Sequence, residues 1–167
     1  PNSNKIYKMP YLARVFKSSK LTYTINRFIS LITAIKKTRK YIDQGNEKVG
    51  LMAEEFPEYI MNTYWINPLE EDAVDKMEKF YQRHTFCMVK MHQCWTGFDI
   101  KDKNVICIIE WSRKNHIPVF LHLKSKKQIL KFKEIVKLYP EVTFILGHLI
   151  GIEEFENTDG DNFYFDI

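Results

Sequence analysis

The chain has 167 residues, of which 45% are apolar, 14% aromatic and 28% charged. This composition excludes a disordered or collagen-like chain and is typical of a globular protein with a hydrophobic core. The length suits one domain.

The net charge of +4 is unevenly distributed. Residues 1–48 hold eleven Lys and Arg against two acidic residues, a net charge of +9, and the remainder carries −5. A basic segment can mark a nucleic-acid or membrane surface. We favour a solvated helix face, because no recognised binding motif accompanies the charge and cations near a helix C-terminus suit its dipole. Nucleic acid is therefore not expected as a partner.

The three cysteines, Cys87, Cys94 and Cys107, form neither a Cys-x-x-Cys motif nor zinc-ribbon spacing. Their odd number and spacing argue against a disulfide framework and favour a reducing, cytoplasmic compartment. No apolar stretch approaches the ~20 residues of a membrane helix, and no signal-peptide core opens the chain. We therefore expect a soluble, cytoplasmic protein that does not bind membranes.

The first 45 residues differ in pattern from the rest. After an irregular start, apolar residues from Ile25 to Ile35 recur at three- and four-residue spacing and predict an amphipathic helix over residues 21–42. Asp43-Gln44-Gly45 predicts its end, and a second helix is expected over residues 46–56, before Pro57. We interpret residues 1–45 as a basic helical segment and residues 46–167 as the globular domain.

From residue 57 onward, apolar strands alternate with amphipathic helices. The strands are expected over residues 59–66, 86–91, 118–123, 142–146 and 162–166. The helices are expected over residues 70–83 and 102–115 and from Ser125 to Pro140, where Ser125 and Gln128 match a capping box. Apolar strands between amphipathic helices indicate a parallel sheet covered by helices, so the predicted class is α/β.

Residues able to perform chemistry follow the strands. Lys90 and His92 end the second strand, His122 lies in the third, His148 follows the fourth, and Asp166 closes the fifth. Ligands bind at these strand ends in α/β folds, because the loops after the strands converge there. Lys90 and His92 are two residues apart and are expected on one face. Three histidines on neighbouring strand ends suit a divalent metal, because neutral imidazole is a common ligand of zinc.

Two further histidines, His84 and His116, come at the ends of helices and before strands. This is the end of the sheet opposite to the one that binds ligands. We expect both to be ordinary surface residues.

Three motifs, in this order, resemble the amidohydrolase-related family of metal-dependent TIM-barrel proteins. They read MVKMH at residues 88–92, IPVFLH at residues 117–122 and YPEVTFILGHLIG at residues 139–151. The segment NFYFD at residues 162–166 resembles the strand that follows in the family. The resemblance covers about residues 46–167 and implies a (β/α)8 barrel.

The resemblance also implies roles for individual residues. His122 matches a metal ligand on the fifth barrel strand. His148 matches the sixth-strand histidine, which binds metal in some members and activates the water or polarises the substrate in others. Lys90 and His92 match a fourth-strand pair and are expected to line the substrate pocket, whereas Asp166 matches a strand-seven position with a structural role at least as often. The implied cofactor is one divalent metal ion, zinc by default.

The chain also departs from the family, because barrel strands 1, 2 and 8 are not recognisable. The His-x-His or Glu-x-His pair of the first strand does not occur before His84, and the aspartate of the eighth would lie beyond Ile167. A complete barrel usually takes about 250 residues. We favour a piece of a longer polypeptide over an inactive or fragmentary member, because an arc of five strands would expose two apolar edges.

The function implied by the resemblance is a metal-dependent hydrolase, in which activated water attacks a C–O or C–N bond of a small carbonyl substrate. Lys90 would face an anionic group such as a carboxylate. One alternative is a non-oxidative decarboxylase of the same superfamily, because the motifs do not separate the two. Another is a non-catalytic protein whose basic N-terminal helix binds nucleic acid or acidic lipid. A homo-oligomer is compatible with each of them.

Overall fold

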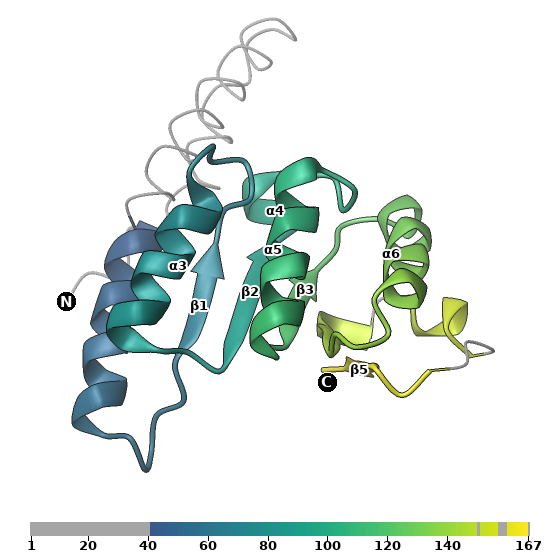
Figure 1. The fold of residues 1–167 in the computed structure, drawn as a ribbon. Coiled ribbons are helices and arrows are strands. Elements are labelled where there is room, and N and C mark those ends of the chain that lie inside the picture. The colour runs from purple at the N-terminus through teal and green to yellow at the C-terminus, as the bar shows by residue number, and fades with distance from the viewer. Residues whose placement is uncertain (1–40, 150, 157–159, 167) are drawn as a thin grey trace, which may run out of the picture. The chain divides into compact units, whose positions relative to one another are not determined.

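The computed structural model describes residues 41–149, 151–156 and 160–166. It contains one parallel sheet in which the strands follow one another in chain order (Figure 1). The strands are β1 (Thr63–Ile66), β2 (Met88–His92), β3 (Val119–His122), β4 (Phe144–Leu146) and β5 (Phe163–Phe165). The helices between them are α3 (Ala73–His84), α4 (Gln93–Thr96), α5 (Lys103–Asn115) and α6 (Lys126–Leu138). The predicted α/β class is confirmed.

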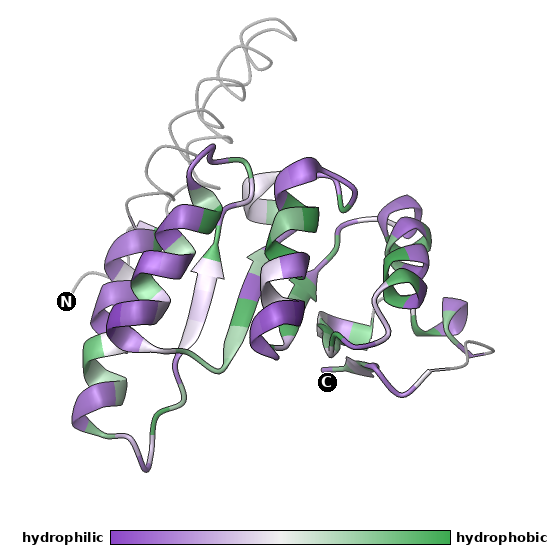
Figure 2. Cartoon of the chain, viewed as in Figure 1, coloured by the Kyte–Doolittle hydropathy of each residue, from purple (hydrophilic) through white to green (hydrophobic). Residues whose placement is uncertain are grey.

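Among the described residues, α3, α5 and α6 cover one face of the sheet. Tyr64, Val89, Leu121 and Phe144 point to that face, where they are at most 5% exposed and pack with apolar residues of α3, α5 and α6. Figure 1 shows α3 and α5 side by side in front of β1 and β2. The outer surface of α3 is hydrophilic (Figure 2), as expected for a helix that buries one stripe against a sheet. Burial of the apolar strand residues on this face forms the core.

The opposite face of the sheet carries polar and aromatic residues that are half-buried. Because successive strand residues alternate between faces, Lys90 and His92 lie together on this face, as predicted. Phe120 and His122 of β3 follow the same alternation. All the strand residues expected to do chemistry on β2 and β3 thus share the face that α3, α5 and α6 leave open.

Residues 41–55 are helical throughout, in the blue segment of Figure 1. The prediction that Asp43-Gln44-Gly45 ends a helix is therefore wrong. A Cβ at Gly45 would meet nothing within 4 Å, and no tertiary contact forces a turn at this glycine. Residues 1–40, and with them nearly all of the predicted helix at 21–42 and of the basic segment, lie outside the described residues.

One side chain of the helix at residues 41–55 makes two hydrogen bonds to the edge strand β1. Asn46, 6% exposed, donates from Nδ2 to the Trp65 carbonyl (2.8 Å) and accepts from the Trp65 N–H through Oδ1 (3.0 Å). In a sheet, a neighbouring strand satisfies both groups of such a residue. Here one amide side chain does so, which fixes the helix against β1.

The other predicted boundaries agree to within a few residues, except that β1 is shorter than predicted and α4 was not predicted. Half of the predicted capping box forms: Ser125 accepts a hydrogen bond from the Gln128 N–H, whereas the Gln128 side chain binds Ile100 and Asp99 instead of returning to Ser125. The first strand is shorter than predicted, because the N–H groups of Tyr59 and Ile60 donate to the Phe56 carbonyl in a turn after the helix. The four-residue helix α4 was not predicted, since it is too short to show a helical period.

The prediction that His84 is an ordinary surface residue is wrong, whereas the same prediction for His116 is confirmed, because His116 is exposed. The His84 side chain is only 10% exposed and lies between two carboxylates, 2.7 Å from Glu54 and 3.1 Å from Glu47. Both glutamates belong to the helix at residues 41–55, so His84 connects that helix to the end of α3. No helix in the described ranges is both long and apolar enough to span a membrane.

We predict that Asn46→Ala lowers the free energy of unfolding by about 1–2 kcal/mol, because it leaves a backbone N–H and a C=O of β1 without partners. Urea unfolding measures the change. Asn115→Ala is the matched control, since Asn115 makes one bond to the Trp111 carbonyl at the last turn of α5. Its cost should stay below about 0.5 kcal/mol, and an equal cost for both variants would contradict the role of Asn46.

Candidate functional site

The register of β2 and β3 places His92 beside His122. Their ring centroids are 4.4 Å apart and the rings are nearly perpendicular, at 86°. His148, which follows β4, stacks on His122 at 4.4 Å with an angle of 19°. The structure therefore brings the three predicted histidines into one cluster at the C-terminal ends of three adjacent strands.

Three ring nitrogens of this cluster have no hydrogen-bond partner among the described residues. Six buried side-chain nitrogen or oxygen atoms lack one among the residues that the structure describes, and four of them lie on the open face of the sheet. These four are both ring nitrogens of His122, Nδ1 of His92 and Nε1 of Trp65. An unpartnered buried polar atom costs free energy, and a bound ligand or ion is one way to satisfy it.

Two of the histidines are held in their neutral form. Burial is the main reason that the pKa of His92 falls to about 4, and the nearby His122 and Lys90 lower it further. Burial also lowers the pKa of His122, helped by Lys90 and His148, while the carboxylate of Asp166 acts in the opposite direction. Neutral imidazole is the form that ligates metal or accepts a proton.

His148 has an unusual backbone conformation for a residue with a side chain. Its φ is 67° and its ψ is 27°, and the next residue, Leu149, has a φ of 49°. The left-handed region costs about 1–2 kcal/mol for such residues. Strain of this kind often accompanies functional positions, where it fixes the direction of a side chain.

Lys90 lies on the same face, two residues before His92. Its Nζ is 4.9 Å from the ring centroid of Phe120, and in the described part of the chain no carboxylate pairs with it. Asp166 is exposed, its backbone N–H donates to the Leu146 carbonyl (3.0 Å), and its charge reaches His122. Within the described ranges, Lys90 is thus a cation without a carboxylate partner, between β1 and β3 on the open face.

Trp65 also belongs to this face, and the sequence analysis missed it. It pairs in register with Lys90, and its ring centroid is 6.0 Å from that of His92. Its alternation with the buried Tyr64 and Ile66 was visible in the sequence. An aromatic residue in a strand is common, however, and nothing in the sequence separated Trp65 from a core residue.

The donor chemistry of the cluster suits a divalent metal, but the described residues do not form a complete ligand set. Both ring nitrogens of the neutral His122 are free to bind one. His122 and His148 turn ring faces toward each other rather than nitrogens. In residues 41–149, 151–156 and 160–166, no three His, Cys, Asp or Glu side chains are arranged around a common ion.

A glycine permits the contact between His122 and His148. A Cβ at Gly147 would overlap the Cδ2 and Nε2 atoms of His122. Gly147 is itself buried at the end of β4. The absence of a side chain at this position therefore gives His122 its place in the cluster.

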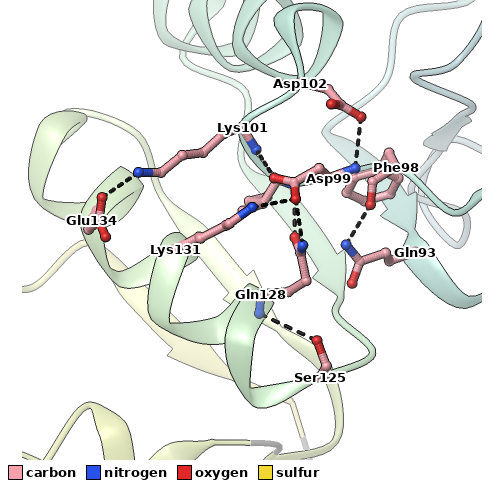
Figure 3. Close-up of polar contacts among 10 residues, drawn as sticks. Gln93, Phe98, Asp99, Lys101, Asp102, Ser125, Gln128, Lys131 and Glu134 are labelled. Carbon is pink, nitrogen blue, oxygen red and sulfur yellow. Dashed lines mark hydrogen bonds and ion pairs between the residues drawn. The ribbon is translucent and has the colours of Figure 1, made fainter.

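Two buried glutamines, Gln93 and Gln128, bind groups of the loop that contains Phe98 and Asp99 (Figure 3). Gln93 follows His92 and is fully buried; it donates to the Phe98 carbonyl (2.6 Å) and accepts from the Lys124 N–H (2.9 Å). Since Lys124 comes two residues after His122, Gln93 links the loops after β2 and β3. These bonds hold the two strand ends, and hence the two histidines, at a fixed separation.

The second glutamine binds an aspartate in the same loop. Gln128 accepts from the Ile100 N–H (2.9 Å) and donates to Asp99 (2.8 Å). Asp99 also accepts from Lys131 and from the Lys101 N–H (3.0 Å). The Lys131 hydrogen bond is the largest reason that the pKa of Asp99 lies well below its usual range. The loop after β2 is thereby attached to α6.

We predict that Gly147→Ala displaces the His122 ring and lowers the free energy of unfolding by about 1–3 kcal/mol, the usual cost of overpacking. Histidine NMR signals and urea unfolding report the two effects. Gly45→Ala is the control with the opposite sign, because its methyl group has room within a helix and should stabilise by about 0.5–1 kcal/mol. Unchanged His122 signals in Gly147→Ala would contradict this account of the cluster.

We predict that Asp99→Asn destabilises the protein by about 1–2 kcal/mol at pH 7, after allowance for partial solvent exposure. Because the folded-state pKa of Asp99 is depressed, its contribution is complete above pH 4 and declines as the pH falls below the unfolded value. The difference between the two proteins should therefore shrink at pH 3. Unfolding midpoints at pH 7 and pH 3 test this, and an equal difference at both would refute it.

The comparisons with known proteins bear on the fold alone. No family model matches the chain, and no curated protein matches it. It is similar to a solved structure of an uncharacterized TIM-barrel protein, Bb4693 from Bordetella bronchiseptica, with a TM-score of 0.59 and 15% identity. The match covers 72% of this chain and 47% of the other, so the chain spans about half the length of that protein. The described strands and helices are an arc of a (β/α)8 barrel, as the sequence predicted.

Proposed function

We propose that the chain contributes to a metal-dependent hydrolase of the amidohydrolase superfamily. The observation that supports this is the environment of His122. It lies at the end of a parallel strand and contacts two other histidines, burial lowers its pKa, and neither ring nitrogen has a partner among the described residues. Ligands bind at the C-terminal strand ends in TIM barrels.

In this proposal His122 holds the ion, and His148 is a second ligand or assists the reaction. A divalent ion such as zinc would supply activation of water and polarisation of a carbonyl. His92 stays neutral at pH 7, because its pKa is about 4, and can accept a hydrogen bond from a polar substrate atom. Lys90 supplies a positive charge for an anionic group, and the remaining ligands come from outside the described residues.

A decarboxylase of the same superfamily is the second candidate, and Lys90 favours it. An ammonium group that no carboxylate of the described residues pairs with suits a substrate carboxylate. Product analysis separates the two candidates, because release of carbon dioxide from a carboxylic acid indicates decarboxylation and cleavage by water indicates hydrolysis.

We predict that the purified chain binds about one divalent ion after supplementation, and that His122→Ala loses it. Elemental analysis measures the ratio, and an unfolding curve checks that the variant is folded. The control is His116→Asn, which removes an exposed histidine at a left-handed position that asparagine tolerates. A metal-free wild-type protein, or equal metal in His122→Ala, would remove support for a metal site in this chain.

A further inference from the structure

The loop after β4, which carries His148, is held by contacts at its far end. The backbone leaves β4 at Leu146, passes through two residues of positive φ, His148 and Leu149, and reaches a third at Gly151, where φ is 76°. The His148 side chain is exposed and makes no hydrogen bond to any described residue. Apart from its stack on His122, its position therefore depends on the path of the backbone.

Gly151 lies directly against α6. A Cβ at this position would be 2.7 Å from both Cδ1 and Cγ2 of Ile129, which is closer than real Cβ atoms approach their neighbours. Ile129 is 1% exposed and belongs to the core, so it cannot move aside without disturbing the packing. Since three residues span at most about 11 Å, a fixed Gly151 restricts where His148 can lie.

Glu154 attaches the same segment to α6 through two further bonds. It ends the short 3₁₀ helix η3 (Ile152–Glu154). Its carboxylate, 19% exposed, pairs with Lys126 at 2.5 Å, and its backbone carbonyl accepts a hydrogen bond from Lys133. The two lysines and Ile129 are spaced at three and four residues, so they lie on one face of α6. The loop is thus attached to a single face of the helix.

We propose that Gly151 and Glu154 are positioning residues for His148. By attaching the loop to α6, they keep His148 in its left-handed conformation and its ring against His122. A partly exposed ion pair such as that of Lys126 with Glu154 contributes little to the stability of a whole protein. Its effect is expected at the loop, where positive φ at residues with side chains costs free energy that other contacts offset. Only the chemical role of His148 rests on the proposed function.

The test follows the ring signals of the five histidines by NMR in the metal-free full chain. His148→Gln identifies the signal of His148 by removing it. Gly151→Ala should shift that signal, because the new methyl group overlaps Ile129 and displaces the loop from α6. Gly97→Ala is the matched control, since Gly97 has nearly the same φ, 78°, but a Cβ there meets nothing within 4 Å. An unmoved His148 signal in Gly151→Ala, or an equal shift in both variants, overturns the proposal.

Variants of the ion pair test Glu154 without adding a side chain to the loop. Lys126→Met removes the ammonium and should shift the His148 signal in the same direction as Gly151→Ala. Lys126→Arg retains the ion pair and should keep the wild-type signal. Lys127→Met is the control, because Lys127 is exposed and no carboxylate of the described residues pairs with it. An unmoved signal in Lys126→Met, or an equal shift in Lys127→Met, contradicts the role of Glu154.

Two further measurements separate positioning from a general loss of structure. In Lys126→Met, the urea unfolding midpoint and the signal of His116, which follows α5 at the opposite end of the sheet, should not change. A lower midpoint with a parallel shift at His116 would show a general structural effect and overturn the proposal. Because the signals are recorded without metal, failure of the chain to bind an ion affects only the proposed function.

Discussion

The pairing register of β2 and β3 determines the rest of the candidate site. In a parallel pair, every side chain of a strand keeps its face only while the register holds, and a slip of one residue reverses them all. With His92 opposite His122, the imidazoles meet on the open face and Met91 and Leu121 enter the core. Because the apolar residues fix the register, the core itself aligns the histidines. The site is thus a consequence of burial on the other side of the same strands.

Buried polar groups in the helices after β2 and β3 and on the open face of the sheet differ in how far they are satisfied. Behind the strand ends, Gln93 and Gln128 are buried and use both ends of their amides on backbone or carboxylate groups. On the open face, buried nitrogen atoms of Trp65 and His122 have no partner in the part of the chain that the structure describes. The unpartnered nitrogens of Trp65 and His122 lower the stability of the fold, whereas the amides of the two glutamines do not. Such a division suits a rigid support beneath a surface that binds ligands.

Much of the fold was predictable from the sequence, because its signals are local. Strand and helix periods gave the α/β class, and the position of His92, His122 and His148 after successive strands predicted their cluster. The shared face of Lys90 and His92 followed from strand alternation. The order of the strands along the chain is enough to predict the histidine cluster, because the C-terminal ends of parallel strands all lie at the same end of the sheet.

The features that escaped prediction depend on contacts between distant residues. Gly45 continues a helix although glycine commonly ends one, since the helix is fixed through Asn46 to a strand nineteen residues away. His84 is enclosed by Glu47 and Glu54, thirty or more residues earlier in the chain. The role of Gly147 depends on a ring from another strand. No local period or spacing encodes such pairs.

The amide of Asn46 has one further consequence, for association between molecules. An open strand edge can recruit a strand from another molecule, and repeated addition leads to aggregates and fibrils. On β1 the N–H and C=O of Trp65 that would begin such a ladder are already engaged by Asn46. The helix at residues 41–55 thereby acts as a guard on this edge. A single side chain within the molecule competes with intermolecular strand addition, in the way that natural sheets limit self-assembly.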